Sequence, residues 1–365
     1  MASTSGESMV LESGGRQVRV TSPAKAAFPG LTKRDVVQYY AAVADRMLAH
    51  LRDRPTALER WPDGVFPGCQ SFYQKHLARG TPGYVATGTV TFPSGRRGTM
   101  ICPSEPAVIV WAAQMNAITF HPWPSTLPRT DRPDQLRLDF DPSPGTGFAE
   151  AVQAANLARE LVGEWGWPIG CKTSGGRGVH AFIPLEPRWT FIEVRHAAIA
   201  IARELQRRAP DLVTTSWWKE DRGARVFVDF NQAAQDRTIA CAYSIRANAR
   251  ATVSMPVTWT QLGNCQPEDF TVATVPAIIA GEPDPWNGVV LFQDHPADLQ
   301  PALDCWQRDL EAGLPELPYP PEFPKMPGEP LRVQPSRAAR QSRSGTMPGT
   351  DRSRRSGGRD PDATA

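Results

Sequence analysis

Apolar positions recur at helical spacing in several stretches of the chain and alternate with polar ones in others. Thr32 and Asp35 resemble an N-cap and a first-turn acid, and apolar side chains then return every three or four residues as far as Leu51. Further helices are predicted over 148–167 and 191–208, and strands over 136–141, 179–183 and 225–230. The apolar run at 108–111 is too short to distinguish a strand from the start of a helix.

The order of these elements predicts the fold class. Strand, helix, strand, helix and strand follow one another between residues 130 and 250, which indicates an α+β domain with a mixed or antiparallel sheet. A chain of 365 residues is long for one domain and comfortable for two. We expect a disordered Ser/Gly-rich N-terminus over 1–17, an ordered region over 18–300, and a disordered tail rich in Pro, Arg and Ser over 315–365.

Composition and charge exclude several classes of protein. The net charge is +2, but residues 331–365 hold eight Arg and three Asp, a net of +5, which leaves −3 for residues 1–330. That balance argues against a general nucleic-acid coat, although it leaves room for local basic grooves. The chain has no 18-residue apolar window and no N-terminal apolar signal core, so we expect a cytoplasmic protein without membrane contact. A function on DNA would place it at the nucleoid. Its six cysteines lie far apart, with no CxxC pair, which favours reduced thiols.

Two carboxylates in the segment LRLDFDP are the first chemical signal. Asp139 and Asp141 lie two residues apart on a predicted strand, so they project from the same face, roughly 7 Å apart at the backbone. Carboxylates this close repel each other and raise one pKa unless a cation lies between them. Oxygen ligands of this kind are those that Mg²⁺ and Mn²⁺ prefer.

A third carboxylate, Asp229, lies in the hydrophobic strand pattern RVFVDFNQ. An acid in such a strand is unfavourable unless it is paired or metal-bound. Three strand-borne aspartates would suit a two-metal site for displacement at phosphorus. The residues alone leave an alternative open, in which Asp139 and Asp141 cap the following helix and Asp229 pairs with an arginine.

Two further segments favour a nucleotide site. KTSGGRGVH offers the backbone amides of a turn, the hydroxyl of Ser174 and the cation of Arg177 to a phosphate or ribose, although it lacks the spacing of a P-loop or of the dinucleotide fingerprint. Arg222, Arg225 and Arg246 could bind triphosphate oxygens or neutralise the aspartates.

Taken together, these motifs resemble the polymerase domain of bacterial end-joining ligase D, within the archaeo-eukaryotic primase superfamily. The resemblance runs from about Val20 to Pro296 and rests on a DxD strand, a TSGxxGxH turn and a late VDFxQ, in that order. It implies an archaeo-eukaryotic primase fold of the α+β class. An RRM-like catalytic sheet flanked by helices would occupy about 131–300, and an N-terminal α/β module about 18–130.

The resemblance also assigns roles to single residues at the nucleotide site. Asp139, Asp141 and Asp229 would hold two Mn²⁺ or Mg²⁺ ions, and Ser174 would lie near the ribose 2′-hydroxyl. His121, which by itself would be a structural histidine, would help to bind the NTP or dNTP. The remaining nucleotide ligands would be Arg177 (where the family often has Lys), His180, Arg222, Gln232 and Arg246.

A second set of matches concerns DNA. Lys25 and Lys33 would capture a 5′-phosphate at a gap or break, and Phe72 and Tyr73 would stack near the template base. Without the resemblance, the two lysines would be ordinary surface residues and the two aromatic side chains would belong to the core. Arg60 and Lys75, which flank these motifs, would contribute to DNA binding.

The chain also departs from the family pattern. Glu59 stands where many relatives carry a lysine, and the spacing from Lys25 to Lys33 is shorter than in the ligase-fused enzymes. No K-x-D-G motif of a ligase is present, so we expect a stand-alone relative.

The expected activity is that of a DNA-directed primase-polymerase, a nucleotidyltransferase that adds NTPs or dNTPs to a 3′-hydroxyl during end joining or gap-filling repair. Gapped or broken DNA would be its partner, with Ku and a separate ATP-dependent ligase as candidates. The alternatives are a de novo primase, a nucleic-acid-binding module that has lost catalysis, and a metal-dependent phosphohydrolase. The clustered acids speak against the inactive module, because without a metal they would only repel one another.

Overall fold

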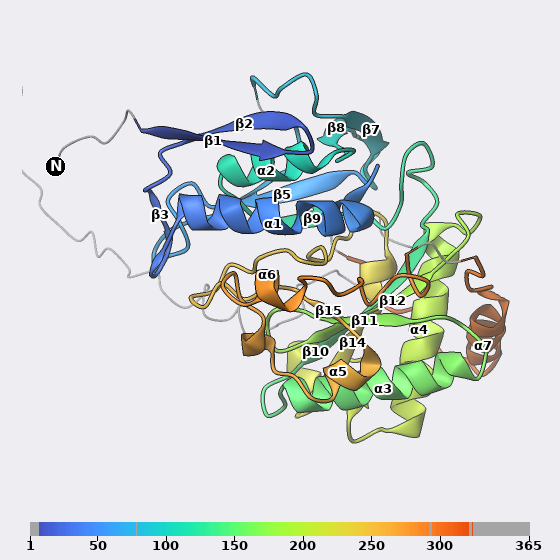
Figure 1. Ribbon diagram of the computed structural model, residues 1–365. Helices are drawn as coiled ribbons and strands as arrows, with labels where there is room; N and C mark the ends of the chain where they lie inside the picture. The colour runs from blue at the N-terminus through green and yellow to red at the C-terminus, as the bar shows by residue number, and fades with distance from the viewer. Residues whose placement is uncertain (1–6, 78, 292–293, 321–322, 324–365) are drawn as a thin grey trace, which may run out of the picture.

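The computed structural model describes residues 7–77, 79–291, 294–320 and 323, and it confirms the α+β class. Two sheets, each with helices packed against it, lie next to each other (Figure 1). Across these described ranges, no helix is long and apolar enough to cross a membrane. All six cysteines are free thiols.

The N-terminal module is built on a five-stranded sheet of order β6-β5-β8-β7, in which β9 also pairs with β5. Helix α1 begins at the predicted cap, where the backbone amide of Thr32 donates to Asp35 Oδ2 at 2.7 Å. The apolar run at 108–111 lies within α2, which packs on α1. The elements after the first hairpin are β3 (Ala26–Phe28), β4 (Leu31–Thr32), α1 (Lys33–Leu51), β5 (Thr56–Arg60), β6 (Phe72–Gln74), β7 (Thr87–Thr91), β8 (Arg97–Ile101), α2 (Pro106–Gln114) and β9 (Ala117–Pro122).

The first strands correct one prediction. Residues 8–17 were expected to be disordered, but β1 (Ser8–Ser13) pairs antiparallel with β2 (Arg16–Thr21). Gly14 and Gly15, both at positive φ, make the two-residue turn that such a hairpin requires. The hairpin is stable because Val18 and Val20 are buried in the core on the side that faces α2.

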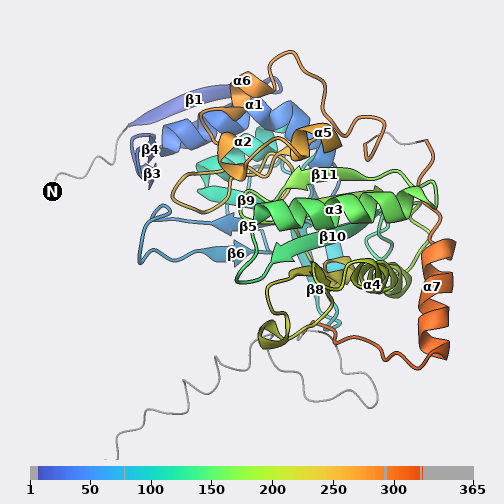
Figure 2. The same ribbon diagram turned by 90° about the horizontal axis from the view of Figure 1, so that it is seen from below.

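The second module holds a six-stranded sheet of order β13-β14-β10-β12-β11-β15. The predicted strands and helices of this region are confirmed, while β11 was not predicted, and α3 ends four residues before the predicted end at 167. Helices α3 and α4 lie side by side along this sheet, and α7 packs beside α4 (Figure 2). The elements are β10 (Gln135–Pro142), α3 (Phe148–Gly163), β11 (Gly170–Thr173), β12 (Val179–Pro184), α4 (Phe191–Arg208), β13 (Val213–Thr214), β14 (Val226–Asp229), β15 (Pro256–Val257), α5 (Trp259–Leu262), α6 (Val275–Ile278) and α7 (Gln300–Glu311).

The chain between β15 and α7 returns to the N-terminal module. Helix α6 contacts α1, where Arg46 donates to the carbonyls of Ile279 and Glu282. Further along, the Asp284 carboxylate accepts from Tyr243 Oη at 2.7 Å and lies 2.9 Å from His50 Nε2. These buried polar contacts hold the two modules together.

The segment after α7 corrects a second boundary. The disordered tail was expected from residue 315, but residues 315–319 pack against α4. The buried guanidinium of Arg195 donates to Glu316 Oε1 at 2.6 Å and to the carbonyl of Leu317 at 2.8 Å, and lies 3.7 Å from the centre of the Tyr319 ring. Most of the expected tail, 321–322 and 324–365, lies outside the described residues.

Replacing Arg195 by Met should destabilise the fold and release this segment. The variant removes the donor to Glu316 Oε1 and to the carbonyls of Leu317 and Pro318, so we expect the free energy of unfolding to fall by about 3 kcal/mol. We also expect faster proteolysis at residues 315–319. Urea denaturation and limited proteolysis with peptide mapping would measure both effects. The exposed pair Arg188–Asp298 gives the control, since Arg188→Met should cost less than about 1 kcal/mol; equal losses in the two variants would contradict the prediction.

Candidate active site

The three predicted carboxylates meet at one place in the second sheet. Asp139 on β10 lies directly opposite Asp229 on β14 in the antiparallel register. Asp141 follows two residues along β10, where its side chain is 56% exposed, whereas that of Asp139 is 21% exposed. The strand alternation that the sequence predicted therefore brings three acids to one surface of the sheet.

The electrostatics of these acids suit a cation. Burial raises the pKa of Asp139 to about 6. Burial, and after it the charge of Asp139, raise the pKa of Asp229 to about 6. The same two causes raise the pKa of Asp141. A bound cation would relieve this repulsion.

The arrangement of the acids is open. Among the described residues, no three His, Cys, Asp or Glu side chains converge closely enough to form a ready-made cage for a metal. An ion such as Mg²⁺ normally takes only one or two protein carboxylates and fills its other positions with water and substrate phosphates. Facing carboxylates on adjacent strands fit that mode of binding.

The alternative interpretation of the acids is wrong about the following helix: α3 begins after Gly147, whose amide donates to Glu150, so neither Asp139 nor Asp141 caps it. Asp229 caps the turn that follows it, where its two oxygens accept from the backbone amide of Asn231 at 2.9 Å and from Gln232 Nε2 at 3.1 Å. Asp141 lies 3.6 Å from Arg222, whereas Arg225 donates to backbone carbonyls. These contacts do not remove the repulsion between the facing carboxylates of Asp139 and Asp229.

A buried lysine that sequence reasoning missed completes the surroundings of Asp139. Lys172 on β11 is fully buried, and its Nζ lies 2.8 Å from His180 Nδ1 and within hydrogen-bond distance of Ser254 Oγ. The opposite ring nitrogen, His180 Nε2, lies 3.4 Å from Asp139 Oδ1. Burial lowers the pKa of Lys172, but either form of its amine can donate to Nδ1, which leaves the hydrogen of the neutral His180 ring on Nε2, facing Asp139. The sequence signal that could have identified Lys172 is its position directly before the TSG motif.

The TSGGRG turn lies beside β10. Ser174 Oγ accepts from the amides of Gly176 and Gly178, each at 3.1 Å, so this hydroxyl shapes the turn. A Cβ at Gly178 would lie 2.6 Å from the carbonyl of Phe140, which explains the need for glycine. Arg177 donates to the carbonyl of Pro142 at 3.0 Å, next to Asp141.

His121 faces this region from the other module. It lies on β9, where its Nε2 is 3.5 Å from Glu59 Oε2 and its ring is 5.2 Å from that of Tyr73. Burial lowers the pKa of His121 and raises that of Asp139, and the charge of Arg246 lowers both. Side chains of both modules thus contribute to one charged region around Arg246.

The predicted DNA residues form a second cluster. Burial, then the charges of Lys25 and Arg60, lower the pKa of Lys33 to about 8, which shows that three cations gather here. The guanidinium of Arg60 lies 5.2 Å from the ring centre of Phe72, whose side chain is exposed, as is that of Tyr73. This exposure rules out the alternative that the aromatic pair belongs to the core. Lys75 lies apart, 3.1 Å from Asp236.

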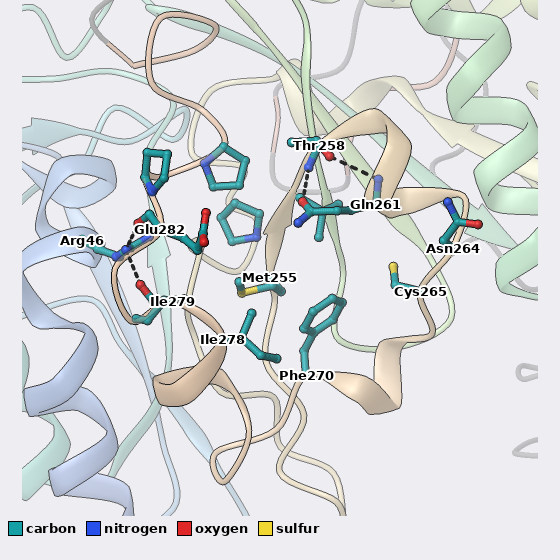
Figure 3. A pocket seen from close by; sticks show the side chains of 14 residues that line it. Arg46, Met255, Thr258, Gln261, Asn264, Cys265, Phe270, Ile278, Ile279 and Glu282 are labelled. Carbon is teal, nitrogen blue, oxygen red and sulfur yellow. Dashed lines mark hydrogen bonds between the residues drawn. The ribbon is translucent and has the colours of Figure 1, made fainter.

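A cavity of about 340 Å³ lies elsewhere, between α5 and α6 (Figure 3). Its walls include Met255, Phe270 and Ile278, and none of the predicted site residues lines it. The predicted site residues therefore gather away from this cavity.

Comparisons with known proteins agree with this geometry. The family model of the LigD primase-polymerase domain matches residues 32–286. The chain is 34% identical over 276 residues to the multifunctional non-homologous end joining protein LigD of Pseudomonas aeruginosa, covering 74% of this chain and 32% of that protein. It is 32% identical over 246 residues to the bifunctional LigD of Bacillus subtilis, covering 67% of this chain and 39% of that protein. The chain thus spans 32–39% of the length of these relatives.

A solved structure supports the fold. The polymerase domain of Mycobacterium tuberculosis ligase D, determined in complex with DNA, superimposes with a TM-score of 0.68 at 30% identity. The match covers 74% of this chain and 97% of that domain. It confirms the primase-like α+β fold expected from the sequence.

Removing one of the facing charges should stabilise the metal-free protein. With chelator present at pH 8, we expect Asp229→Asn to raise the free energy of unfolding by about 1–2 kcal/mol, because a carboxyl with a raised folded-state pKa destabilises the fold above that pKa. The gain should shrink as the pH falls from about 6 towards 4, where Asp229 becomes protonated in both states. Urea titrations across this pH range test it against the exposed control Asp298→Asn. A loss of stability at pH 8 would contradict it.

Lys172→Met should weaken metal binding without unfolding the protein. Methionine fills a similar volume but cannot donate to His180, so Asp139 loses an oriented neighbour and we expect about tenfold weaker Mn²⁺ binding. Calorimetric titration measures the affinity, thermal unfolding checks the fold, and Lys75→Met serves as the matched control. Unchanged Mn²⁺ affinity in a folded Lys172→Met variant would refute the positioning role.

Proposed function

This chain belongs to the LigD primase-polymerase family, and we propose that it transfers a nucleotidyl group from an NTP or dNTP to a 3′-hydroxyl under the direction of a DNA template. The observation that carries the proposal is the pair of facing carboxylates, Asp139 and Asp229, with Asp141 beside them. Such an accumulation of repelling acids is useful where cations and phosphates must meet.

The acids and the surrounding cations would have different roles in the reaction. Asp139, Asp141 and Asp229 would supply carboxylate oxygens to Mn²⁺ or Mg²⁺. Such ions, when bound, would lower the pKa of the 3′-hydroxyl and balance the charge of the departing pyrophosphate.

The cations around the acids would face the triphosphate. Arg222 lies 3.6 Å from Asp141, and the charge of Arg246 acts on Asp139. Both guanidinium groups would hold the triphosphate oxygens for in-line attack. Arg177 and His180 border the same surface, and Gln232 orients Asp229.

The cluster of Lys25, Lys33 and Arg60 supports a role at DNA gaps or breaks. A phosphate placed among three cations would offset the mutual repulsion that lowers the pKa of Lys33. The exposed Phe72 next to Arg60 offers a surface on which a base can stack. We therefore propose gap filling or end joining in DNA repair, with Ku and a separate ligase as candidate partners, ahead of de novo priming, which needs no 5′-phosphate.

Primer extension tests this proposal. A gapped template with a 5′-phosphate, Mn²⁺ and NTPs should give templated product with the wild type. The double variant Asp139→Ala/Asp141→Ala should give at least a thousandfold less, since it removes the carboxylates of the proposed metal site. Lys33→Met should extend an unphosphorylated gap normally but lose the gain that the 5′-phosphate provides.

Each other outcome has a separate meaning. Product from a primer-free template would favour the primase. Nucleotide hydrolysis that does not depend on a template would favour a phosphohydrolase. DNA binding without product in any lane would refute the enzyme and leave a binding module.

A further inference from the structure

His121 carries a buried polar atom that no described residue satisfies. The side chain is 6% exposed, its Nε2 lies 3.5 Å from Glu59 Oε2, and its Nδ1 is buried without a hydrogen-bond partner. A buried nitrogen of this kind is unfavourable in the free protein and is suited to a contact with a ligand.

Glu59 is held in its charged form beside this ring. Burial favours the neutral acid, but the hydrogen bond from His121, together with smaller contributions, outweighs burial and lowers the pKa of Glu59. Trp61 Nε1 also donates to Glu59 Oε1 at 3.1 Å. A carboxylate therefore occupies a fixed place at the back of His121.

The contact with Glu59 limits the protonation states in which His121 can bind a phosphate. A carboxylate only accepts, so Nε2 must carry a hydrogen, and in the neutral ring Nδ1 is then a bare lone pair. A bare lone pair repels a phosphate oxygen. The other neutral tautomer would turn a bare Nε2 towards Glu59. Only the imidazolium can donate to Glu59 and to a phosphate at the same time.

The groups around His121 favour the neutral ring until an anion arrives. Burial lowers the pKa of His121, and the charges of Arg246 and Lys172 lower it further, against the opposing effect of Glu59. His180 is close enough to His121 for the charge of one ring to lower the pKa of the other, and the Tyr73 ring lies 5.2 Å from that of His121. A nucleotide's phosphates would neutralise the two cations and so allow the ring to take up a proton.

We propose that Glu59 makes the binding of a nucleotide's phosphate at His121 conditional on the uptake of one proton from solvent by Nδ1. Glu59 thus becomes a residue that determines affinity for the substrate. The inference rests on the proposed nucleotide site, and it concerns binding alone, before any bond is formed or broken.

Calorimetry of MnATP binding without DNA tests the inference. Titrations in buffers of different ionisation enthalpy should show that wild type takes up close to one proton more per nucleotide than Glu59→Gln does. The wild-type dissociation constant should rise by up to tenfold per pH unit between about pH 7 and 8.5. Glu59→Gln should bind with a nearly flat pH profile, because the Gln amide can donate to a bare Nε2 and so permits a neutral ring that donates from Nδ1.

Controls separate the possible outcomes. Glu105→Gln removes a carboxylate that precedes α2 and pairs with Arg16 on β2, and this variant should keep the wild-type pH profile. His121→Asn cannot titrate and should behave like Glu59→Gln. Equal proton uptake in wild type and Glu59→Gln, or no ATP binding by wild type, would overturn the inference. If proton uptake depends on Glu59 but the protein fails to extend primers, the inference about nucleotide binding stands and the proposed polymerase activity is refuted.

Discussion

The facing of Asp139 and Asp229 across two central strands is the constraint on which the site depends. Two acids in register at partly buried positions oppose folding, as their raised pKa values show. Their surroundings offset part of this cost: the buried Lys172 contacts Asp139 through His180, and Asp229 caps the first turn after β14. The two acids therefore lower the stability of the fold at this position, as is typical of sites that bind charged ligands.

Hydrogen bonds between the two modules also fix the positions of residues at the candidate site. Thr119 Oγ1 on β9 donates to the carbonyl of Ile245 at 2.8 Å, and the amide of Phe120 donates to Ser244 Oγ at 3.1 Å. These bonds place His121, the next residue of β9, opposite the second sheet. Arg246 follows Ile245 directly, so the same line of contacts that joins the modules also sets the position of the central cation.

Local periodicity predicted what depends on local structure. The strands that carry Asp139 and Asp229 alternate clearly, and the sequence therefore indicated which acids share a surface. It did not indicate the role of Lys172, because the contact with His180 depends on the pairing of β11 with β12. The N-terminal hairpin was missed although Gly14 and Gly15 mark its turn, since short strands in a Ser/Gly-rich stretch resemble disorder. The partnership of Glu59 with His121 likewise needs the pairing of β5 with β9.

The packed segment after α7 shows how far the support of one acid extends. Arg195 Nε donates to Asn231 Oδ1 at 2.9 Å, and Asn231 Nδ2 donates to the carbonyl of Pro318 at 3.0 Å. The backbone amide of the same Asn231 donates to Asp229. An acid that is repelled by its neighbour needs a rigid turn to hold it in place, and here the rigidity comes from a segment almost ninety residues further along the chain. Residues 315–319 therefore support the candidate active site, although by composition they look like the beginning of a tail.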